Sequence, residues 1–432
     1  MSQTTRRQFV CQAAAILAVH SQVSASQPRA KDRLRIAAIG VGNRGWDNLL
    51  AVRDEAVVAV CDVDARYLER ARQRFPDARQ FVDFREVFDS TELDAVVVSC
   101  PDHTHAHAAL SAISHKLHVY CEKPLAHSVA ETRRIAQAAR AADVVTQLGN
   151  HHHSSDGYRQ AAAWVRSGLL GEIRNVAAWT TRPHWRQGFA ARPDEKPPVP
   201  ATLNWDLWLG PAPPRPYHPS YHPLTWRAWW DFGGGALGDM GPHMLDPIVA
   251  ALELKAPTTV AAVSSPVSVE AAPLSSRVTF QFPATKKRGA VKLQWFDGDR
   301  KPPVELTGLK RLSPHGALLL GSAGKLFVPA YGGRPVFIPP AGKTRPPAPK
   351  WLANPSPGHH AEWILACRGG PPTSSDFQYG ANLTQTCLLG NVALRLGETF
   401  RWNDVSGAAV GQPKAGPLLH RDYRDGWKLP PT

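Results

Sequence analysis

The chain has 432 residues, of which 43% are hydrophobic and 20% charged, the composition of an ordinary soluble globular protein. One hydrophobic core rarely fills a chain of this length, so we expect two domains. The formal net charge is +14, but Lys and Arg are scattered, and their densest group is the short run 286–288. This pattern indicates a basic surface without a specific nucleic-acid module. No apolar run approaches the ~18 residues of a membrane span.

The first 30 residues contain the three regions of an export signal. Arg6 and Arg7 form a twin-arginine pair, a modestly apolar run covers 13–19, and the small residues at 23–25 offer a cleavage site. The sequence therefore predicts a signal peptide over 1–30 and export by the twin-arginine (Tat) pathway to the periplasm or beyond. That pathway carries folded proteins, so export requires no disulfides. The six cysteines show no CxxC spacing and are expected in the core.

A glycine-rich turn follows the first apolar run, 34–39. Its sequence is GVGNRG and a helical pattern follows, so the GxGxxG motif has the strand–turn–helix setting of a dinucleotide site. Glycines allow a tight turn and close approach of the backbone, and the amide groups at the start of the helix attract a pyrophosphate. The candidate cofactor-binding residues of this turn are Gly40, Gly42, Asn43, Arg44 and Gly45.

Asp62 follows the second predicted strand, 56–61, about 20 residues beyond the first glycine. An acid at this position binds the ribose hydroxyls of the adenosine and repels a 2′-phosphate, which favours NAD. Arg66 lies nearby, so NADP is not excluded.

Two further predicted strands, 94–100 and 116–121, are followed by polar residues. Ligands of parallel α/β sheets bind beyond the carboxyl ends of the strands. We therefore expect the residues at these ends to face the glycine turn and to help hold the cofactor: Pro101, His105, Glu122 and Lys123. The segment 33–150 is thus predicted to be a Rossmann domain with a doubly wound parallel sheet, and Lys123 is expected beside the nicotinamide.

The stretch 226–246, WRAWWDFGGGALGDMGPHMLD, carries a second group of polar residues. If a helix follows the three glycines, Asp239 and His243 lie one turn apart on one face, and Asp246 is a further neighbour of His243. A carboxylate beside an imidazole forms an acid–base pair or half of a metal site, and the same pattern also occurs on ordinary solvated helices.

The rest of the chain is predicted to form a second α/β domain over 151–402 and a tail over 403–432 without clear periodicity. Helical periods cover 158–167, 358–367 and 379–396. Strand-like runs cover 175–181, 259–264, 277–282, 291–296 and 318–320.

These motifs together resemble the Gfo/Idh/MocA family of oxidoreductases. The similarity rests on RIAAIGVGNRG (35–45), SCPDHTHAHAAL (99–110) and VYCEKPLAHS (119–128), and it continues through GLLGEIRNV (168–176) and NWDLWLGPAP (204–213) to 229–246, as in the exported branch of the family. The resemblance implies a Rossmann domain followed by an α/β domain with an open, largely antiparallel sheet. It also implies an NAD(P) cofactor and a homo-oligomer.

By this resemblance, Lys123 positions the substrate and assists proton transfer, His243 is the general acid or base, and Asp239 orients His243 or the substrate. The chemistry agrees, because oxidation of a carbinol carbon needs a base for the hydroxyl proton and histidine titrates near neutrality. A nearby lysine stabilises a developing alkoxide. Asp246 either orients His243 or caps the interior of the helix.

The expected substrate is a sugar or sugar derivative. Tryptophans are dense over 205–230, and aromatic rings stack on the C–H faces of sugars, so Trp229 is a candidate contact, although at least half of these rings are expected in the core. Three histidines occupy 151–153. Adjacent residues of an extended chain point to opposite sides, which disfavours a metal site and leaves His151 and His153 as candidate hydrogen-bonding residues for substrate.

The sequence thus predicts an exported NAD(P)-dependent oxidoreductase that transfers hydride at a carbinol carbon. The periplasm has no nicotinamide pool, so we expect a tightly held cofactor that serves two sugars in turn. Two alternatives stay open. One is a redox-neutral glycosidase or lyase that oxidises, eliminates and re-reduces. The other is a non-catalytic sugar-binding protein on the same fold.

Overall fold

The computed structural model of the protein describes residues 33–309, 311–344 and 355–431. The predicted export signal, 1–30, lies outside these residues. Two sheets organise the described chain, one in each half, and the predicted domain boundary near residue 150 falls between β6 of the first sheet and β7 of the second.

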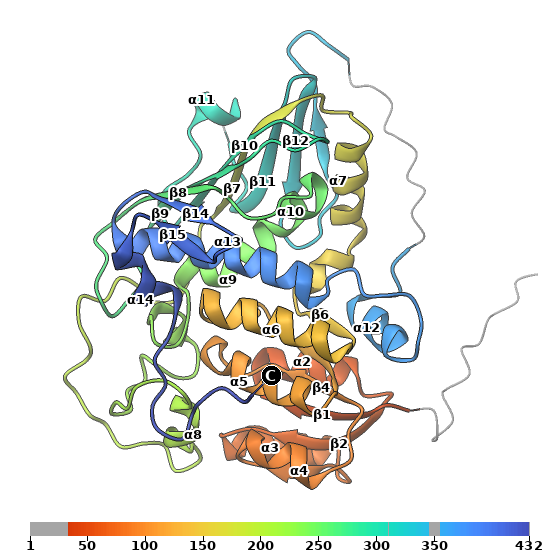
Figure 1. Ribbon diagram of the computed structural model, residues 1–432, viewed down its shortest axis with the longest axis vertical. Coiled ribbons are helices and arrows are strands. Elements are labelled where there is room, and N and C mark those ends of the chain that lie inside the picture. The colour runs from red at the N-terminus through yellow and green to blue at the C-terminus, as the bar shows by residue number, and fades with distance from the viewer. Residues whose placement is uncertain (1–32, 310, 345–354, 432) are drawn as a thin grey trace, which may run out of the picture. The chain divides into compact units, whose positions relative to one another are not determined.

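The first half forms a six-stranded, wholly parallel sheet in the order β3-β2-β1-β4-β5-β6 (Figure 1). Helices cover both faces, since Ala37 and Ile39 pack in one core cluster and Ala38, which points the other way, packs in another. The order of the strands reverses between β1 and β4, which opens a crevice at their carboxyl ends. The predicted Rossmann sheet is confirmed. Its strands are β1 (Arg35–Ile39), β2 (Ala56–Cys61), β3 (Arg79–Phe81), β4 (Ala95–Val98), β5 (His118–Cys121) and β6 (Thr146–Leu148). Its helices are α2 (Asn43–Ala51), α3 (Ala65–Arg74), α4 (Val87–Ser90), α5 (Asp102–Ser114) and α6 (Val129–Ala142).

The second half forms a nine-stranded sheet in the order β13-β12-β11-β7-β10-β9-β8-β14-β15. Strands β7 and β10 run parallel and the other neighbouring pairs run antiparallel, which confirms the predicted open, largely antiparallel sheet. Its strands are β7 (Ile173–Thr180), β8 (Thr259–Ser264), β9 (Ser276–Phe282), β10 (Val291–Asp297), β11 (His315–Gly321), β12 (Gly324–Pro329), β13 (Val336–Ile338), β14 (Phe400–Asn403) and β15 (Ala408–Val410).

Helix α13 (Phe377–Leu396) joins the two halves. It lies against α6 of the Rossmann half and against α9 (Gly235–Met244) and β8 of the second half (Figure 1). The residues from Leu34 onward accordingly form one compact unit. None of the helices in the described ranges is long and apolar enough to cross a membrane. The remaining helices of this half are α7 (Asp156–Arg166), α8 (Trp205–Leu209), α10 (Asp246–Leu252), α11 (Val304–Thr307), α12 (His359–Cys367) and α14 (Gly416–Leu419).

The tail beyond residue 403 is ordered by single contacts instead of by a periodic face. The hydroxyl of Tyr423 donates to Glu131 Oε1 at 2.9 Å, and the ring of Trp427 lies 6.0 Å from that of Phe84. Both partners belong to the Rossmann half, so the end of the chain closes over the outside of that half. The tail also contains β15 and α14, which are too short to show a period in the sequence.

Candidate active site

The glycine turn has the geometry that a dinucleotide site requires. Gly40 has a φ of +79°, and a Cβ on Gly45 would lie 1.9 Å from the carbonyl oxygen of Gly40, so the turn closes only with glycine at these two positions. Helix α2 begins directly after Gly42, with Asn43 and Arg44 in its first turn, where amide groups have no partner within the helix. These amides are available to a pyrophosphate, so the turn fits NAD.

Asp62 lies beside this turn. Its Oδ2 accepts from the amide of Val41 at 2.9 Å and its Oδ1 from the amide of Asp64 at 3.0 Å. Burial raises the pKa of Asp62 to about 6, so the carboxylate is largely ionised at neutral pH. The ionised group can accept ribose hydroxyls, as predicted. Arg66 is bound by Asp64, with Nε–Oδ1 at 3.0 Å, and is therefore already paired.

The ends of β4 and β5 are held together by hydrogen bonds of buried side chains. Glu122 accepts from Arg44 Nε at 3.1 Å and from Asn48 Nδ2 at 3.0 Å. Pro101 is the N-cap of α5. His105 on α5 is buried, with Nδ1 2.8 Å from the carbonyl oxygen of Pro124 and Nε2 2.7 Å from that of Cys100. The buried ring is neutral, because burial lowers its pKa, and so it donates to only one of these two carbonyl oxygens; the predicted contact of His105 with the cofactor stays a prediction.

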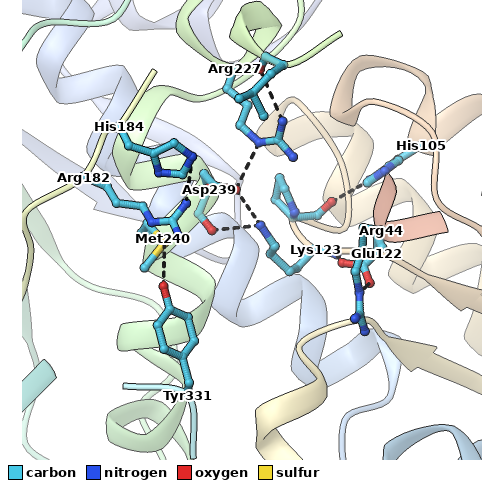
Figure 2. Close-up of polar contacts among 12 residues, drawn as sticks. Arg44, His105, Glu122, Lys123, Arg182, His184, Arg227, Asp239, Met240 and Tyr331 are labelled. Carbon is cyan, nitrogen blue, oxygen red and sulfur yellow. Dashed lines mark hydrogen bonds and ion pairs between the residues drawn. The ribbon is translucent and has the colours of Figure 1, made fainter. Parts of the chain in front are cut away.

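Lys123 reaches across the crevice to helix α9. Its Nζ donates to Asp239 Oδ1 at 2.8 Å and to the backbone oxygen of Asp239 at 2.9 Å, while Arg227 Nε donates to the same Oδ1 at 3.2 Å (Figure 2). The side chains of Lys123 and Asp239 are each 11% exposed. Burial raises the pKa of Asp239, but Lys123 and Arg227 outweigh it and hold that pKa well below its usual range.

Helix α9 owes its close approach to glycines. Gly235 has a φ of +62°, and a Cβ there would lie 2.5 Å from Ala272 Cβ. A Cβ on Gly241 would lie 2.7 Å from Cys387 Sγ on α13. The glycines thus let α9 enter sharply and lie tight against α13, which sets the depth at which Asp239 and His243 are presented.

His243 is half-buried, and its Nδ1 is buried without a hydrogen-bond partner in the described chain. It lies among other rings, with centroids 6.1 Å from His151, 5.8 Å from His152 and 6.1 Å from Tyr331. Burial, reinforced by Lys123, lowers the pKa of His243 well below its ordinary value, so the ring is neutral at pH 7 and able to accept a proton. The carboxylate of Asp239 accepts hydrogen bonds from Lys123 and Arg227, and no hydrogen bond joins it to His243 among the described residues.

The three consecutive histidines form a 3₁₀ helix, His151–Ser154, in place of the predicted extended segment. Hydrogen bonds from His153 N to Asn150 O and from Ser155 N to His152 O impose the turn. His151 and His152 therefore both lie near His243, whereas His153 points to α10, where its Nδ1 meets Asp246 Oδ1 at 2.8 Å. Within the described ranges no group of three or more His, Cys, Asp or Glu side chains is arranged to hold a metal ion.

Asp246 forms its ion pair with His153 and not with His243. Burial lowers the pKa of His153, but the carboxylate of Asp246 more than offsets it, so the pKa lies above its ordinary value. Tyr379 also donates to Asp246 Oδ1, at 2.5 Å. The ion pair with Asp246 corrects the prediction that His153 offers a free hydrogen bond to substrate.

Trp229 is fully buried, which corrects its candidacy as a substrate contact. Its indole N–H donates to Ser220 O at 2.9 Å, and its ring stacks on Phe189 with centroids 4.4 Å apart. Trp208, Trp226 and Trp230 are buried as well, so most of the tryptophans in this stretch pack in the core.

Several residues of the site were not predicted from the sequence. Arg227, two residues before Trp229, donates a hydrogen bond to Asp239. Asp102, inside the PDHTH segment, interacts electrostatically with Lys123, Arg227 and Asp239, and burial raises its pKa to about 7. Asp102 had a signal, because it lies at a strand end that was expected to face the crevice. Arg227 had none, since it lies on a 3₁₀ helix, Thr225–Ala228, that is too short to show a period.

A glycine turn at the reversal of a parallel sheet, with an acid beside it and Lys123, Asp239 and His243 close to one another, is typical of a dinucleotide-dependent oxidoreductase. The model of the oxidoreductase family's NAD-binding Rossmann fold matches residues 34–150, and that of its C-terminal alpha/beta domain matches 158–290. The chain belongs to the Gfo/Idh/MocA family, and its first half is an NAD-binding domain.

The chain is 36% identical to an inositol 2-dehydrogenase of Acidothermus cellulolyticus over 148 residues, which is 33% of this chain and 43% of that protein. It spans less than half the length of the first curated relatives it matches. The WlbA dehydrogenase from Bordetella pertussis, solved with NADH and UDP-GlcNAcA, superposes with a TM-score of 0.62 at 18% identity over 86% of this chain and 99% of that one. An aldose–aldose oxidoreductase from Caulobacter crescentus gives 0.51 at 18% identity over 86% of this chain and 100% of that one. These structures show the shared fold.

Proposed function

We propose that this protein is an exported, NAD(P)-dependent oxidoreductase that acts on a sugar or sugar derivative by hydride transfer at a carbinol carbon. The observation that carries the proposal is the contact of Lys123 with Asp239 across the crevice, beside a neutral His243 whose Nδ1 has no partner in the described chain. Named sugar and inositol dehydrogenases among the relatives support the substrate class.

Lys123, Asp239 and His243 each have a separate role in the proposed reaction. When bound, NAD supplies the hydride acceptor. His243 accepts the proton of the reacting hydroxyl, because burial keeps the ring neutral. The ammonium group of Lys123 stabilises the negative charge that develops on the hydroxyl oxygen. Asp239 accepts two hydrogen bonds from Lys123, one at its carboxylate and one at its backbone oxygen, and so holds the ammonium in place.

The cofactor is proposed to be retained between turnovers. The segment that follows Asp62 forms an isolated β-bridge with the second half: Ala65 N donates to Thr202 O at 2.8 Å, and Asn204 N donates to Val63 O at 2.9 Å. This crossing lies next to Asp62 in the chain, and we propose that it hinders release of the cofactor. Retention suits an enzyme that works away from a nicotinamide pool. The aldose–aldose oxidoreductase of the same fold is, by its name, an enzyme that acts on two sugars.

The decisive experiment is the analysis of nucleotide released from the purified protein, followed by turnover. We expect NAD(H) or NADP(H) near one equivalent per chain, and a change in absorbance at 340 nm when single sugars are added. A His243→Asn variant keeps the nucleotide and loses the change. Cleavage of a glycoside without net change at 340 nm favours the redox-neutral alternative. A protein that carries no nucleotide and alters no sugar with added cofactor contradicts the proposal.

Export is tested separately by cell fractionation. The full chain is expected outside the cytoplasm, and replacement of both Arg6 and Arg7 by Lys is expected to retain it inside. Equal distribution of the two proteins contradicts the proposed pathway and leaves the chemistry untouched.

A further inference from the structure

Arg182 is a half-buried cation without an acidic partner. It follows β7, whose carboxyl end leads toward the site, and its backbone is fixed by hydrogen bonds from Arg182 N to Thr180 Oγ1 at 3.2 Å and from Gly298 N to Arg182 O. Its guanidinium group makes no ion pair within the described chain; the contact recorded for it is Nη1 to His184 Nε2 at 3.5 Å. The other neighbour that feels its charge is His315, another basic group.

This arginine lies in the same group of side chains as Asp239 (Figure 2). His184 interacts electrostatically with Arg182, with Asp239 and with Arg227, so both guanidinium groups lie near one imidazole. Burial lowers the pKa of His184, with Arg182 adding to the effect, so the ring is uncharged at neutral pH. This group of side chains therefore holds the cations Lys123, Arg182 and Arg227 against the ionised carboxylate of Asp239. Asp102, with a pKa raised to about 7, compensates in part.

The excess charge lies at Arg182 and not at Lys123. The ammonium of Lys123 is satisfied by Asp239, and Arg227 shares that carboxylate while its Nη1 donates to Leu224 O at 3.3 Å. Among the described residues, Arg182 has no carboxylate or carbonyl acceptor, and its Nη1 reaches only His184 Nε2. A guanidinium without an acidic partner is the group that recognises a carboxylate, because its planar fork matches the two oxygens.

Resting on the proposed function, we propose that the substrate is an acidic sugar of the hexuronate class, whose carboxylate is bound by Arg182, with Arg227 and His184 beside it. A single carboxylate brings one negative charge and two acceptor oxygens, which matches one unpaired guanidinium. A sugar phosphate carries up to two charges and three acceptor oxygens, more than one free guanidinium satisfies.

The test measures equilibrium binding to the NADH-saturated protein by calorimetry, so it needs no turnover. The probes are matched pairs that differ in the carboxylate: glucuronate and glucose, galacturonate and galactose, mannuronate and mannose. Glucose 6-phosphate is added as the competing anion. We expect the acid of at least one pair to bind about tenfold or more tightly than its neutral partner. The preference should shrink as salt is raised.

Three variants assign the preference to Arg182. Arg182→Gln is expected to abolish it by weakening the acid alone, and Arg182→Lys to keep part of it, since an ammonium retains the charge but loses the fork. Arg186→Gln is the matched control, because Arg186 is exposed on the same loop and lies 5.0 Å from the Phe189 ring. Unchanged NADH affinity and thermal unfolding show that each variant is folded.

Equal binding of acid and neutral sugars, no binding of any of the three acids, or tighter binding of glucose 6-phosphate than of every acid overturns the inference. So does an Arg182→Gln variant that keeps the preference. A different result contradicts the proposed function, namely the absence of nucleotide and of any change at 340 nm. A failure of the hexuronate proposal is therefore distinguishable from a failure of the proposed function.

Discussion

The pairing of charged side chains differs between the cofactor side and the substrate side of the crevice. On the cofactor side, the charged groups are paired within the protein: Arg44 with Glu122, Arg66 with Asp64, and Asp62 with the amide of Val41. These pairs exist without any ligand. A site for a constant ligand can be built this way, because its shape and charge never vary.

On the substrate side, polar groups lack partners. Within the described residues Arg182 meets no carboxylate, and the Nδ1 atoms of His151 and His243 are buried without a hydrogen bond. Unpaired buried groups cost free energy unless a ligand supplies the missing partner. The comparison teaches that the charged side chains of the cofactor side are already paired in the folded chain, whereas the substrate side keeps polar side chains that a ligand can pair.

The contact that joins the two sides should produce the largest effect when broken. Lys123→Met leaves the buried Asp239 with Arg227 alone and removes the charge at the reacting oxygen, so we expect kcat/KM to fall about 1,000-fold with NADH affinity changed far less. Steady-state kinetics and NADH titration measure the two effects. Lys287→Met, an exposed lysine paired with Glu253, is the control. A loss of NADH affinity as large as the loss of kcat/KM would place Lys123 on the cofactor side.

Acid should destabilise the fold through histidines buried in their neutral form. Burial lowers the pKa of His103 and His360 to about 3 and of His359 to about 4. The unfolded chain takes up these protons near pH 6.5, while the native protein does not until the lowered pKa is reached. Each histidine therefore lowers the free energy of unfolding by about 1.4 kcal/mol per pH unit as pH falls from about 6 toward 4.

Urea unfolding at pH 7, 6 and 5 checks this slope. His360→Phe, which keeps a ring stacked on Tyr120, should reduce the slope by the share of one histidine. Stability that stays flat or rises between pH 6 and 5 would show that protonation of these rings is compensated elsewhere.

The same contrast explains what the sequence could predict. The dinucleotide turn is a local pattern, so its glycines, its helix and Asp62 were found from neighbouring residues. The strand 259–264 was predicted with the bounds of β8, because a short run with β-branched residues is a local signal. Asp239 and His243 were placed on one helix by spacing alone.

Contacts between distant segments were not predictable. Arg227, Arg182 and Asp102 meet around Asp239 through tertiary packing, and no period relates them. His153 was expected on the same side as His151, but two i→i+3 hydrogen bonds, invisible in composition, turn the expected extended segment into a 3₁₀ helix that brings His152 beside His151 instead. Trp229 was misassigned because ring density does not reveal which rings face inward.

Asp62, the acid on the cofactor side, should determine whether the protein prefers NADH or NADPH. Asp62→Ser removes a carboxylate that is expected to bind ribose hydroxyls and repel a 2′-phosphate, so we expect NADH to bind about tenfold more weakly and NADPH to bind no worse. Fluorescence titration of both nucleotides measures the change. Asp77→Ser, at an exposed turn of the same half, is the control. Equal weakening of both nucleotides would mean that Asp62 supports the turn without reading the ribose.

The smallest effect concerns the second-half segment that forms a β-bridge with the chain after Asp62. Asn204 caps helix α8 through a hydrogen bond from Leu207 N to its Oδ1 at 3.0 Å, and its own amide bonds Val63 beside the ribose position. Asn204→Ala loses the cap, at a cost of about 1 kcal/mol, and loosens the crossing. NADH should then dissociate a few-fold faster in a stopped-flow displacement experiment, with little change in its association rate. Asp376→Ala removes the equivalent cap of α13, far along the chain from this crossing, and should cost similar stability without changing the dissociation rate. If both variants release NADH equally fast, general loosening of the fold governs release; if Asn204→Ala alone does, the second half of the chain holds the cofactor that the first half binds.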